Sequence, residues 1–270
     1  MTIQTALRQG QQLLEKADVS APRLNAEVLL AHAVGCERSW LFTHSNEELR
    51  EVWWIHYGRY LHERMQGKPT QHITGVQEFY GREFRVTPDV LIPRPETEHL
   101  IEAALMLGAR KIVDIGTGSG AIAITLALET GAQVVGTDIS LAALRVAAAH
   151  THSSRVEWLA CDLGSALAGD YFDLVVSNPP YIAAGDKSTL QREVRDYEPA
   201  VALYGGDDGL EVYRRLVPEA ERLLRPGGWL VMELGHTSGE AVSGMLGAWR
   251  NVEIRKDLAN LPRVILAQRP

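Results

Sequence analysis

The sequence predicts an α/β protein in which a mostly parallel β-sheet carries helices on both faces and follows a small helical bundle and a β-hairpin connector. Two observations support this prediction. From residue 110 onwards, short apolar runs of strand length alternate with longer segments of helical period. Such alternation is typical of parallel strands joined by crossover helices. Before residue 73, apolar residues recur at helical spacing instead.

The first 72 residues are expected to form the helical bundle. Apolar stripes run through residues 3–17 and 24–34, and Gly35 marks the end of the second helix. Ser45 and Glu48 have the spacing of a capping box and predict the start of a third, longer helix. Nothing in this part of the chain suggests chemistry.

Residues 73–95 have a different character. Two short strand-like runs flank Gly81, and the segment "TPDVLIPRPETE" then brings three prolines within eight residues. We expect a hairpin followed by a stiff connector. We therefore predict a helical domain at residues 1–72, a connector at 73–95 and an α/β domain at 96–270.

Composition excludes several classes of function. The net charge of −7 argues against a surface built to hold nucleic acid by its phosphates. Cys36 and Cys161 lie far apart and favour reduced thiols, and the nine histidines form no metal-binding motif. There is neither a secretory signal nor an apolar run long enough to cross a membrane. We expect a cytoplasmic monomer with no metal and no membrane partner.

A glycine-rich turn follows the first predicted strand of the α/β domain. In "VDIGTGSGAIAI" the strand enters a helix through Gly116, Gly118 and Gly120. Glycines allow a tight turn and let a ligand approach the free N–H groups at the helix start. Asp138 ends the next strand, 22 residues after Gly116, where a carboxylate can bind both hydroxyls of a ribose. Asp162 follows the third strand, close to the expected position of an adenine.

The turn leaves three interpretations open: a connection without ligand, a dinucleotide site and a site for S-adenosylmethionine. Its G-x-G-x-G spacing differs from the G-x-G-x-x-G fingerprint of dinucleotide sites. Asp114 would also place negative charge near a pyrophosphate. S-adenosylmethionine has a ribose, an adenine and a cationic sulfonium but no phosphate, so it fits the turn better.

The segment "VSNPPYIA" ends the fourth strand in an unusual way. Two prolines, which cannot donate backbone hydrogen bonds, follow Asn178 and precede Tyr181. Ligands of doubly wound sheets bind beyond the carboxyl ends of the strands, so Asn178 is expected to face the methyl donor. Its amide and the Pro179 carbonyl can accept hydrogen bonds from an NH2 group, and Tyr181 offers a flat face. The segment predicts a clamp for a planar amide or amidine nitrogen that receives a methyl group; the alternative is a proline-rich surface turn.

The combination of "DIGTGSG", "SNPPYI" and "VLIPRPETE" resembles the HemK/PrmC family over essentially the whole chain. Members of that family use S-adenosylmethionine to methylate the glutamine side-chain nitrogen, N5, in the GGQ motif of class-1 peptide-chain release factors. The resemblance implies a Rossmann-like class I methyltransferase domain with a seven-stranded, mostly parallel sheet. It also implies S-adenosylmethionine as cofactor, no metal, and release factors as protein substrates that the helical domain recognises.

The resemblance assigns roles to individual residues. The residues that it implies for cofactor binding are Gly116, Thr117, Gly118, Ser119, Gly120, Asp138, Asp162, Leu163 and Asn178. Among them, the glycine turn would hold the methionine part and Asp138 the ribose. The residues that it implies for binding the substrate glutamine are Asn178, Pro179, Pro180 and Tyr181. Relatives often carry an aromatic residue where this chain has Leu163, so apolar packing replaces stacking on the adenine here.

Two other readings of the same motifs remain open. The NPPY signature is shared by enzymes that methylate adenine N6 in nucleic acids, and the chain could also be a cofactor-binding scaffold without catalysis. Glu96 and Glu98, after the last proline of the connector, could line the rim of the site or be acids favoured at a helix start.

Overall fold

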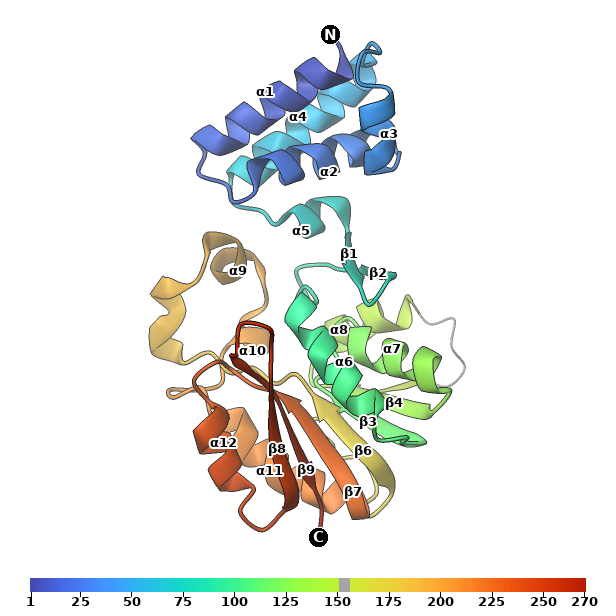
Figure 1. Ribbon diagram of the computed structural model, residues 1–270, viewed down its shortest axis with the longest axis vertical. Helices are drawn as coiled ribbons and strands as arrows, with labels where there is room; N and C mark the ends of the chain where they lie inside the picture. Colours follow the sequence, from blue (N-terminus) through green and yellow to red (C-terminus); the bar gives the residue numbers. More distant parts are fainter. Residues whose placement is uncertain (151–155) are drawn as a thin grey trace. The chain divides into compact units, whose positions relative to one another are not determined.

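The computed structural model describes residues 1–150 and 156–270, and its internal contacts divide the chain into two compact units (Figure 1). The smaller unit comprises Met1–Val76 together with Gln191–Tyr197, a short segment from the second half of the chain. The larger unit comprises Gln77–Leu190 and Glu198–Pro270. The contacts thus group most of the hairpin with the sheet. The predicted division into a helical domain, a connector and an α/β domain, with boundaries at residues 72 and 95, stays a prediction.

The smaller unit is helical, as its apolar stripes predict. It contains α1 (Ile3–Lys16), α2 (Pro22–Val34), α3 (Arg38–Thr43), α4 (Glu51–Met65), α5 (Thr70–Thr74) and α9 (Arg192–Tyr197). Leu14, Leu30 and Tyr57 are among the side chains that form its buried core. The α9 segment is held by the Arg64–Glu193 ion pair and by the Tyr197 hydroxyl, which donates to the Gln66 carbonyl at 3.1 Å.

The predicted start of the third long helix is wrong. α4 begins at Glu51, and Ser45 and Glu48 do not cap it. Residues 45–49 pair instead with the start of the chain: the Gln4 N–H donates to the Ser45 carbonyl at 2.9 Å and the Leu49 N–H to the Met1 carbonyl at 2.8 Å. These residues run alongside the chain start, where Glu48 forms a β-bridge with Thr2, so the helix begins after them.

The larger unit contains all but the first residue of a two-stranded hairpin, β1 (Val76–Phe79) with β2 (Arg82–Arg85), and a seven-stranded sheet in the order β5-β4-β3-β6-β7-β9-β8. The first five of these strands are parallel, and β9 runs antiparallel to both of its neighbours, β7 and β8. The strands are β3 (Lys111–Ile115), β4 (Gln133–Asp138), β5 (Val156–Ala160), β6 (Phe172–Ser177), β7 (Leu224–Glu233), β8 (Arg250–Lys256) and β9 (Pro262–Gln268). The predicted α/β architecture is confirmed.

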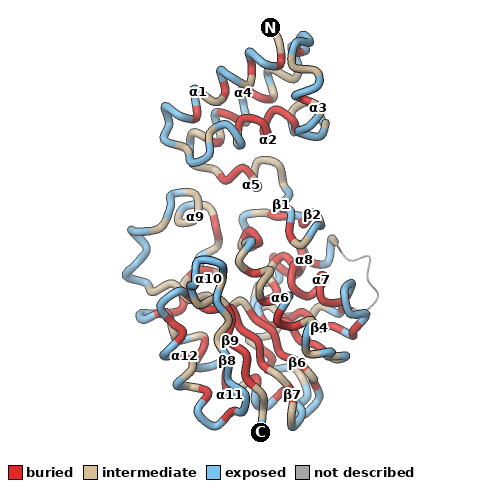
Figure 2. Tube along the Cα trace, viewed as in Figure 1, coloured by how far each residue is buried: buried red, intermediate tan, exposed pale blue. Residues whose placement is uncertain are grey.

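Helices cover both faces of this sheet because side chains alternate along each strand. On β6, Leu174 and Val176 join the core beneath α6 (Glu98–Leu105) and α7 (Ala121–Thr130). Val175 points the other way, into the core beneath α11 (Glu211–Leu223) and α12 (Gly239–Met245). The central strands are buried, whereas the edge strand β8 is largely exposed (Figure 2).

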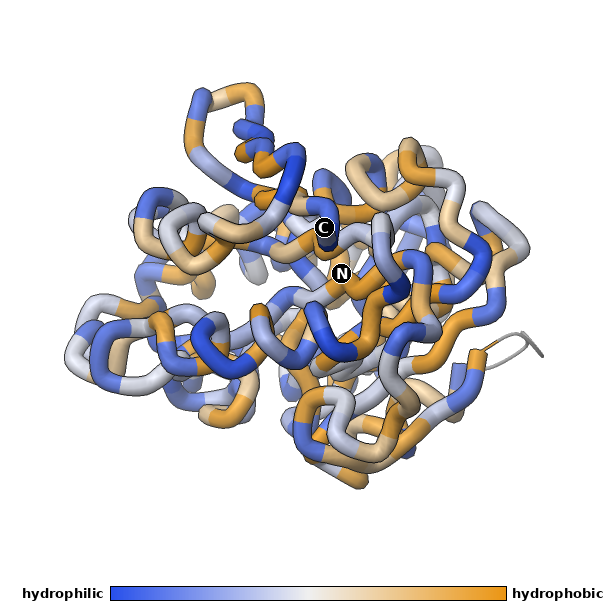
Figure 3. Tube along the Cα trace, turned by 90° about the horizontal axis from the view of Figure 1, so that it is seen from below, coloured by the Kyte–Doolittle hydropathy of each residue, from blue (hydrophilic) through white to orange (hydrophobic). Residues whose placement is uncertain are grey.

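Helix α8 (Leu141–Ala148) packs on β4 and β5. The other elements are short: η1 (Pro95–Thr97), η2 (Ala184–Thr189) and α10 (Ala200–Leu203). Hydrophobic and hydrophilic stretches alternate along the chain (Figure 3), as expected where each element buries one side. Within residues 1–150 and 156–270, no helix has the length and apolar character needed to cross a bilayer.

Strand order reverses at β3, which pairs with β4 on one side and with β6 on the other. Since all three strands are parallel, their carboxyl ends meet at one edge of the sheet. This is the position at which doubly wound sheets bind ligands.

The packing of α1 against α4 is testable through two glycines. A Cβ atom added at Gly10 would lie 1.9 Å from the Tyr57 hydroxyl oxygen and 2.7 Å from its Cζ, whereas nothing lies within 4 Å of the same position at Gly58. We expect Gly10→Ala to lower the free energy of unfolding by about 1–3 kcal/mol through overpacking. The matched Gly58→Ala change should raise it by about 0.5–1 kcal/mol through helix propensity. Urea denaturation measures both; a Gly10→Ala variant as stable as the native protein would contradict this packing.

Candidate active site

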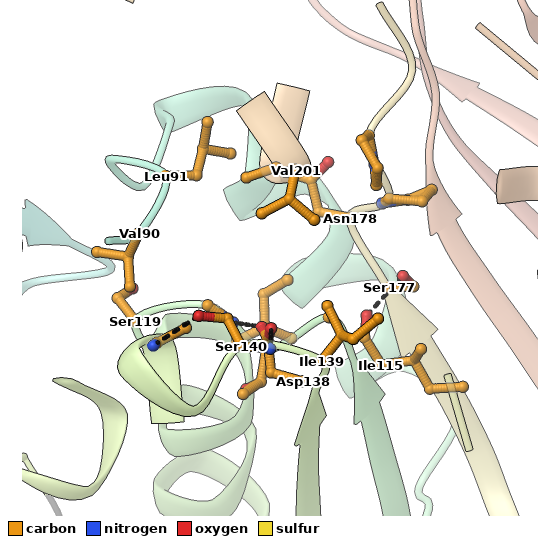
Figure 4. Close-up of a pocket in the computed structure, with 18 of the residues that line it drawn as sticks. Val90, Leu91, Ile115, Ser119, Asp138, Ile139, Ser140, Ser177, Asn178 and Val201 are labelled. Carbon is orange, nitrogen blue, oxygen red and sulfur yellow. Dashed lines mark hydrogen bonds between the residues drawn. The ribbon is translucent and has the colours of Figure 1, made fainter. Parts of the chain in front are cut away.

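A cavity lies in the larger unit at the carboxyl ends of β3, β4 and β6 (Figure 4). One side is formed by the glycine turn and the end of β4, and another by Asn178 and Val201. Val90 and Leu91, from the proline-rich connector, close a third side. The motifs singled out in the sequence therefore converge on a single cavity.

The glycine turn needs glycine for two separate reasons. Gly116, Gly118 and Gly120 have φ angles of +74°, +55° and +81°, which side chains rarely adopt. At Gly120 a Cβ atom would also lie 2.9 Å from the ring of Trp158, so the helix start could not pack there. At Gly116 and Gly118 nothing lies within 4 Å of such an atom, which leaves the turn open to a ligand. Thr117 and Ser119 line the cavity with them, but Gly120 does not.

Asp138 is held at the end of β4 by backbone donors. Its Oδ2 accepts from the Gly118 N–H at 2.9 Å, and its Oδ1 accepts from the Ser140 N–H at 2.8 Å (Figure 4). A carboxylate has about four acceptor sites, so both oxygens can still accept hydrogen bonds from a diol in the cavity. The two backbone donors therefore fix the orientation of the Asp138 carboxylate at the edge of the cavity.

Asp114 lies beneath the turn and outside the cavity lining. It is fully buried, and its Oδ2 accepts from the Thr117 hydroxyl at 2.6 Å. Burial raises the pKa of the Asp114 carboxyl to about 7, although the hydrogen bonds from Thr117 and from the Ala123 backbone lower it. The hydrogen bond from Thr117 to the buried Asp114 carboxyl thus helps to hold the conformation of the glycine turn.

Asp162 and Leu163 follow β5 and line the cavity. The Asp162 carboxylate pairs with Arg215 at 2.5 Å, with both side chains about half exposed. Leu163 has a left-handed backbone, φ +51°, and its side chain packs against the core beneath α11. Leu163 therefore contributes apolar surface to the cavity, and its packing on an adenine stays a prediction.

The end of β6 is tied to the end of β3 because the Ser177 hydroxyl donates to the Ile115 carbonyl at 2.7 Å (Figure 4). Asn178, Pro179 and Pro180 line the cavity, but Tyr181 does not. The Tyr181 ring packs against the core beneath α11, and its hydroxyl donates to Glu233 Oε1 at 3.3 Å. The cavity lining therefore contains the asparagine and both prolines of the NPPY segment but not the tyrosine.

Two residues that contact Asn178 directly or through one hydrogen bond, Thr97 and Glu233, were not singled out in the sequence. The Thr97 hydroxyl accepts from Asn178 Nδ2 at 3.2 Å and donates to Glu233 Oε2 at 2.6 Å. Burial raises the pKa of Glu233 to about 7, while the hydrogen bonds from Thr97 and Tyr181 lower it. Glu233 could have been noticed in the sequence as a charged residue within the apolar strand "WLVMEL". Thr97 could have been noticed because it lies within the segment "IPRPETE".

Glu96 and Glu98, the two acids beside Thr97, lie outside the cavity lining. Glu98 accepts a hydrogen bond from the Tyr80 N–H at 2.9 Å and so fixes the hairpin turn to the start of α6. Among the residues that the structure describes, no three His, Cys, Asp or Glu side chains are grouped so that they could hold a metal ion.

Comparisons with known proteins show the family of this chain. Residues 5–75 match the PrmC N-terminal domain, and residues 95–196 match the methyltransferase small domain. A release factor glutamine methyltransferase from Koribacter versatilis is 43% identical over 278 residues, covering 100% of this chain and 99% of that protein. One from Moorella thermoacetica is 42% identical over 281 residues, covering 100% and 99%. This chain belongs to the release factor glutamine methyltransferase family.

Solved structures at lower identity share the fold. A methyltransferase from Pyrococcus furiosus has 18% identity and a TM-score of 0.55, covering 70% of this chain and 90% of that one. A 16S rRNA methyltransferase from T. thermophilus, solved with AdoMet and guanosine, has 23% identity and a TM-score of 0.52, covering 72% and 50%. The resemblance drawn from the three sequence motifs is confirmed, together with the class I methyltransferase fold.

The raised pKa of Glu233 predicts how stability depends on pH. Between about pH 4.5 and pH 7 the folded protein keeps a proton that the unfolded chain releases, so the free energy of unfolding falls as pH rises through this window. Glu233→Gln cannot ionise and avoids this loss. Relative to the native protein, its stability should improve by up to about 3 kcal/mol from pH 5 to pH 8. Urea denaturation across this range measures the difference, and a constant difference would contradict a raised pKa at Glu233.

Proposed function

We propose that this protein transfers a methyl group from S-adenosylmethionine to the side-chain nitrogen, N5, of the GGQ glutamine of class-1 peptide-chain release factors. The carrying observation is the Asn178 side chain, which lies at the cavity with its nitrogen engaged by Thr97 and its oxygen left to accept from an incoming amide. Full-length similarity to release factor glutamine methyltransferases supports the choice of substrate.

The residues around the cavity suit S-adenosylmethionine, whose sulfonium supplies an activated methyl group when bound. The open turn at Gly116 and Gly118 gives the methionine part access to backbone N–H groups. Asp138 offers acceptors to the ribose hydroxyls, and Leu163 and the exposed Ile139 provide apolar surface for the adenine. No phosphate-binding cation is required by a ligand of this kind.

The substrate clamp would act by orienting a poor nucleophile. The lone pair of an amide nitrogen is delocalised into its carbonyl, so the nitrogen must be aligned closely with the methyl group. Asn178 Oδ1 and the Pro179 carbonyl would accept its two N–H groups and stabilise the positive charge that develops on it. Alignment of this kind can contribute about 7–11 kcal/mol in well-oriented systems. Pro179 and Pro180 keep the acceptors rigid. As the N–C bond forms, the bond between the methyl group and sulfur breaks, and the methylated nitrogen would then lose one of its protons to water.

We further propose that residues 1–72 recognise the release factor. All the cofactor motifs lie after residue 110, and the buried core of the helical unit contains no group suited to methyl transfer. A protein substrate needs a larger contact area than its single glutamine provides.

Labelled S-adenosylmethionine distinguishes this function from adenine methylation. We expect one methyl group on the GGQ glutamine of a release factor, located by mass spectrometry, and none on a release factor with alanine at that position. Label on adenine in DNA with unlabelled proteins would contradict the proposal and establish the alternative.

The cofactor assignment predicts the effect of Asp138→Ala. Loss of a charged acceptor for the ribose should weaken S-adenosylmethionine binding by about 1.5–3 kcal/mol. Glu102→Ala removes an exposed carboxylate of α6 outside the cavity and should leave the affinity unchanged. Calorimetry measures both dissociation constants, and equal affinities in the two folded variants would refute the ribose assignment.

The clamp assignment predicts the effect of Asn178→Ala. Most of the proposed cofactor contacts come from the glycine turn and Asp138, so the cofactor dissociation constant should change little. The rate constant for methyl transfer should fall at least about a hundredfold, the usual scale for losing a positioned hydrogen-bonding group. Single-turnover kinetics on a release factor test this, and a rate within threefold of the native one would show that Asn178 does not hold the substrate.

A further inference from the structure

We propose that Thr97 and Glu233 are positioning residues, which fix the Asn178 amide so that Oδ1, and not Nδ2, faces the nitrogen to be methylated. The inference deepens the proposed function and rests on it. Thr97 ends η1, Glu233 ends β7, and Asn178 follows β6, so three elements separated in sequence meet at this point.

The three side chains form a continuous hydrogen-bond chain. Asn178 Nδ2 donates to the Thr97 hydroxyl at 3.2 Å, and that hydroxyl donates to Glu233 Oε2 at 2.6 Å. Thr97 is 4% exposed and Glu233 is 2% exposed. Few water molecules can therefore compete for these bonds, and hydrogen bonds in such surroundings are stronger than in water.

The chemistry of the chain sets its direction. Above pH 7, where the Glu233 carboxyl is ionised, it can only accept, and a threonine hydroxyl has a single proton. When that proton is donated to Glu233, the Thr97 oxygen can only accept, so the Asn178 side chain must turn its NH2 group towards Thr97. Its oxygen is then the atom left for the substrate. An amide in the opposite orientation would present N–H groups to the substrate NH2 and repel it.

The same carboxylate also holds the other end of the NPPY segment. Glu233 Oε1 accepts from the Tyr181 hydroxyl at 3.3 Å, and the Glu233 carbonyl accepts from the Tyr213 hydroxyl of α11 at 2.8 Å. Thus one buried group orients Asn178 and anchors Tyr181, on both sides of the two prolines. This explains why Tyr181 lies outside the cavity lining.

A buried carboxylate is costly when its partners are neutral hydroxyls, as they are here. Glu96 adds to this cost by raising the pKa of Glu233, and Arg263 opposes it. For the stability of the core of the larger unit, an apolar residue at position 233 would serve as well as this carboxylate. Its hydrogen bonds instead end at the residues that flank the methyl-transfer site.

The first test compares two substitutions at Thr97. Thr97→Val keeps the shape and removes the hydroxyl, whereas Thr97→Ser keeps the hydroxyl. We expect Thr97→Val to lower kcat at least about tenfold with an unchanged dissociation constant for S-adenosylmethionine, and Thr97→Ser to restore most of it. The matched control is Thr125→Val in α7, which removes another fully buried hydroxyl outside the cavity and should leave kcat unchanged.

The decisive test combines Thr97→Val with Asn178→Ala. If Thr97 acts through Asn178, the double variant should be no slower than Asn178→Ala alone. Losses that multiply would overturn the inference, as would native kcat in Thr97→Val. Glu233→Gln gives a second measurement should Thr97→Val fail to fold, because an amide no longer fixes the direction of the chain; native kcat in that variant would also overturn it.

Rates are expressed relative to the native protein on whichever substrate it labels. A native protein that labels no release factor contradicts the proposed function. Unchanged relative rates in the Thr97 and Glu233 variants contradict the positioning role. The two failures are therefore distinguishable.

Discussion

The parallel pairing of β3 with β6 is the constraint on which the site depends. Val113 lies opposite Val175 and Asp114 opposite Val176, so both strands end at the same level of the sheet. The glycine turn that follows β3 and the Asn178 segment that follows β6 consequently line one cavity, although they are far apart in sequence. The Ser177 hydroxyl strengthens the alignment by bonding the Ile115 carbonyl across the two strand ends.

Beneath this cavity the protein buries two carboxyl groups at a cost in stability. Asp114 supports the glycine turn and Glu233 supports the NPPY segment, and burial raises the pKa of each to about 7. The apolar cores on both faces of the sheet offset that cost. In this arrangement one buried acid lies behind the proposed cofactor side of the cavity and another behind its proposed substrate side. The protein thus gives up some stability to fix the orientation of the lining residues.

The sequence predicts the sheet and its helices well because the alternation of strands and helices is long and regular. It fails at the start of α4, where Ser45 and Glu48 pair with the beginning of the chain and no local pattern reveals that pairing. It also misses the link between Thr97 and Glu233, since their contact depends on how the fold brings η1 to the end of β7. For the same reason the sequence could not show that Tyr181 turns to Glu233.

The orientation of the Asn178 amide is the central claim, and a crystal structure with S-adenosylhomocysteine and a GGQ peptide tests it most directly. The glutamine nitrogen should lie about 3 Å from Asn178 Oδ1 and from the Pro179 carbonyl, and Asn178 Nδ2 should remain on Thr97. A glutamine whose carbonyl oxygen is bound by Asn178 Nδ2, or one bound away from residues 178–180, would contradict it.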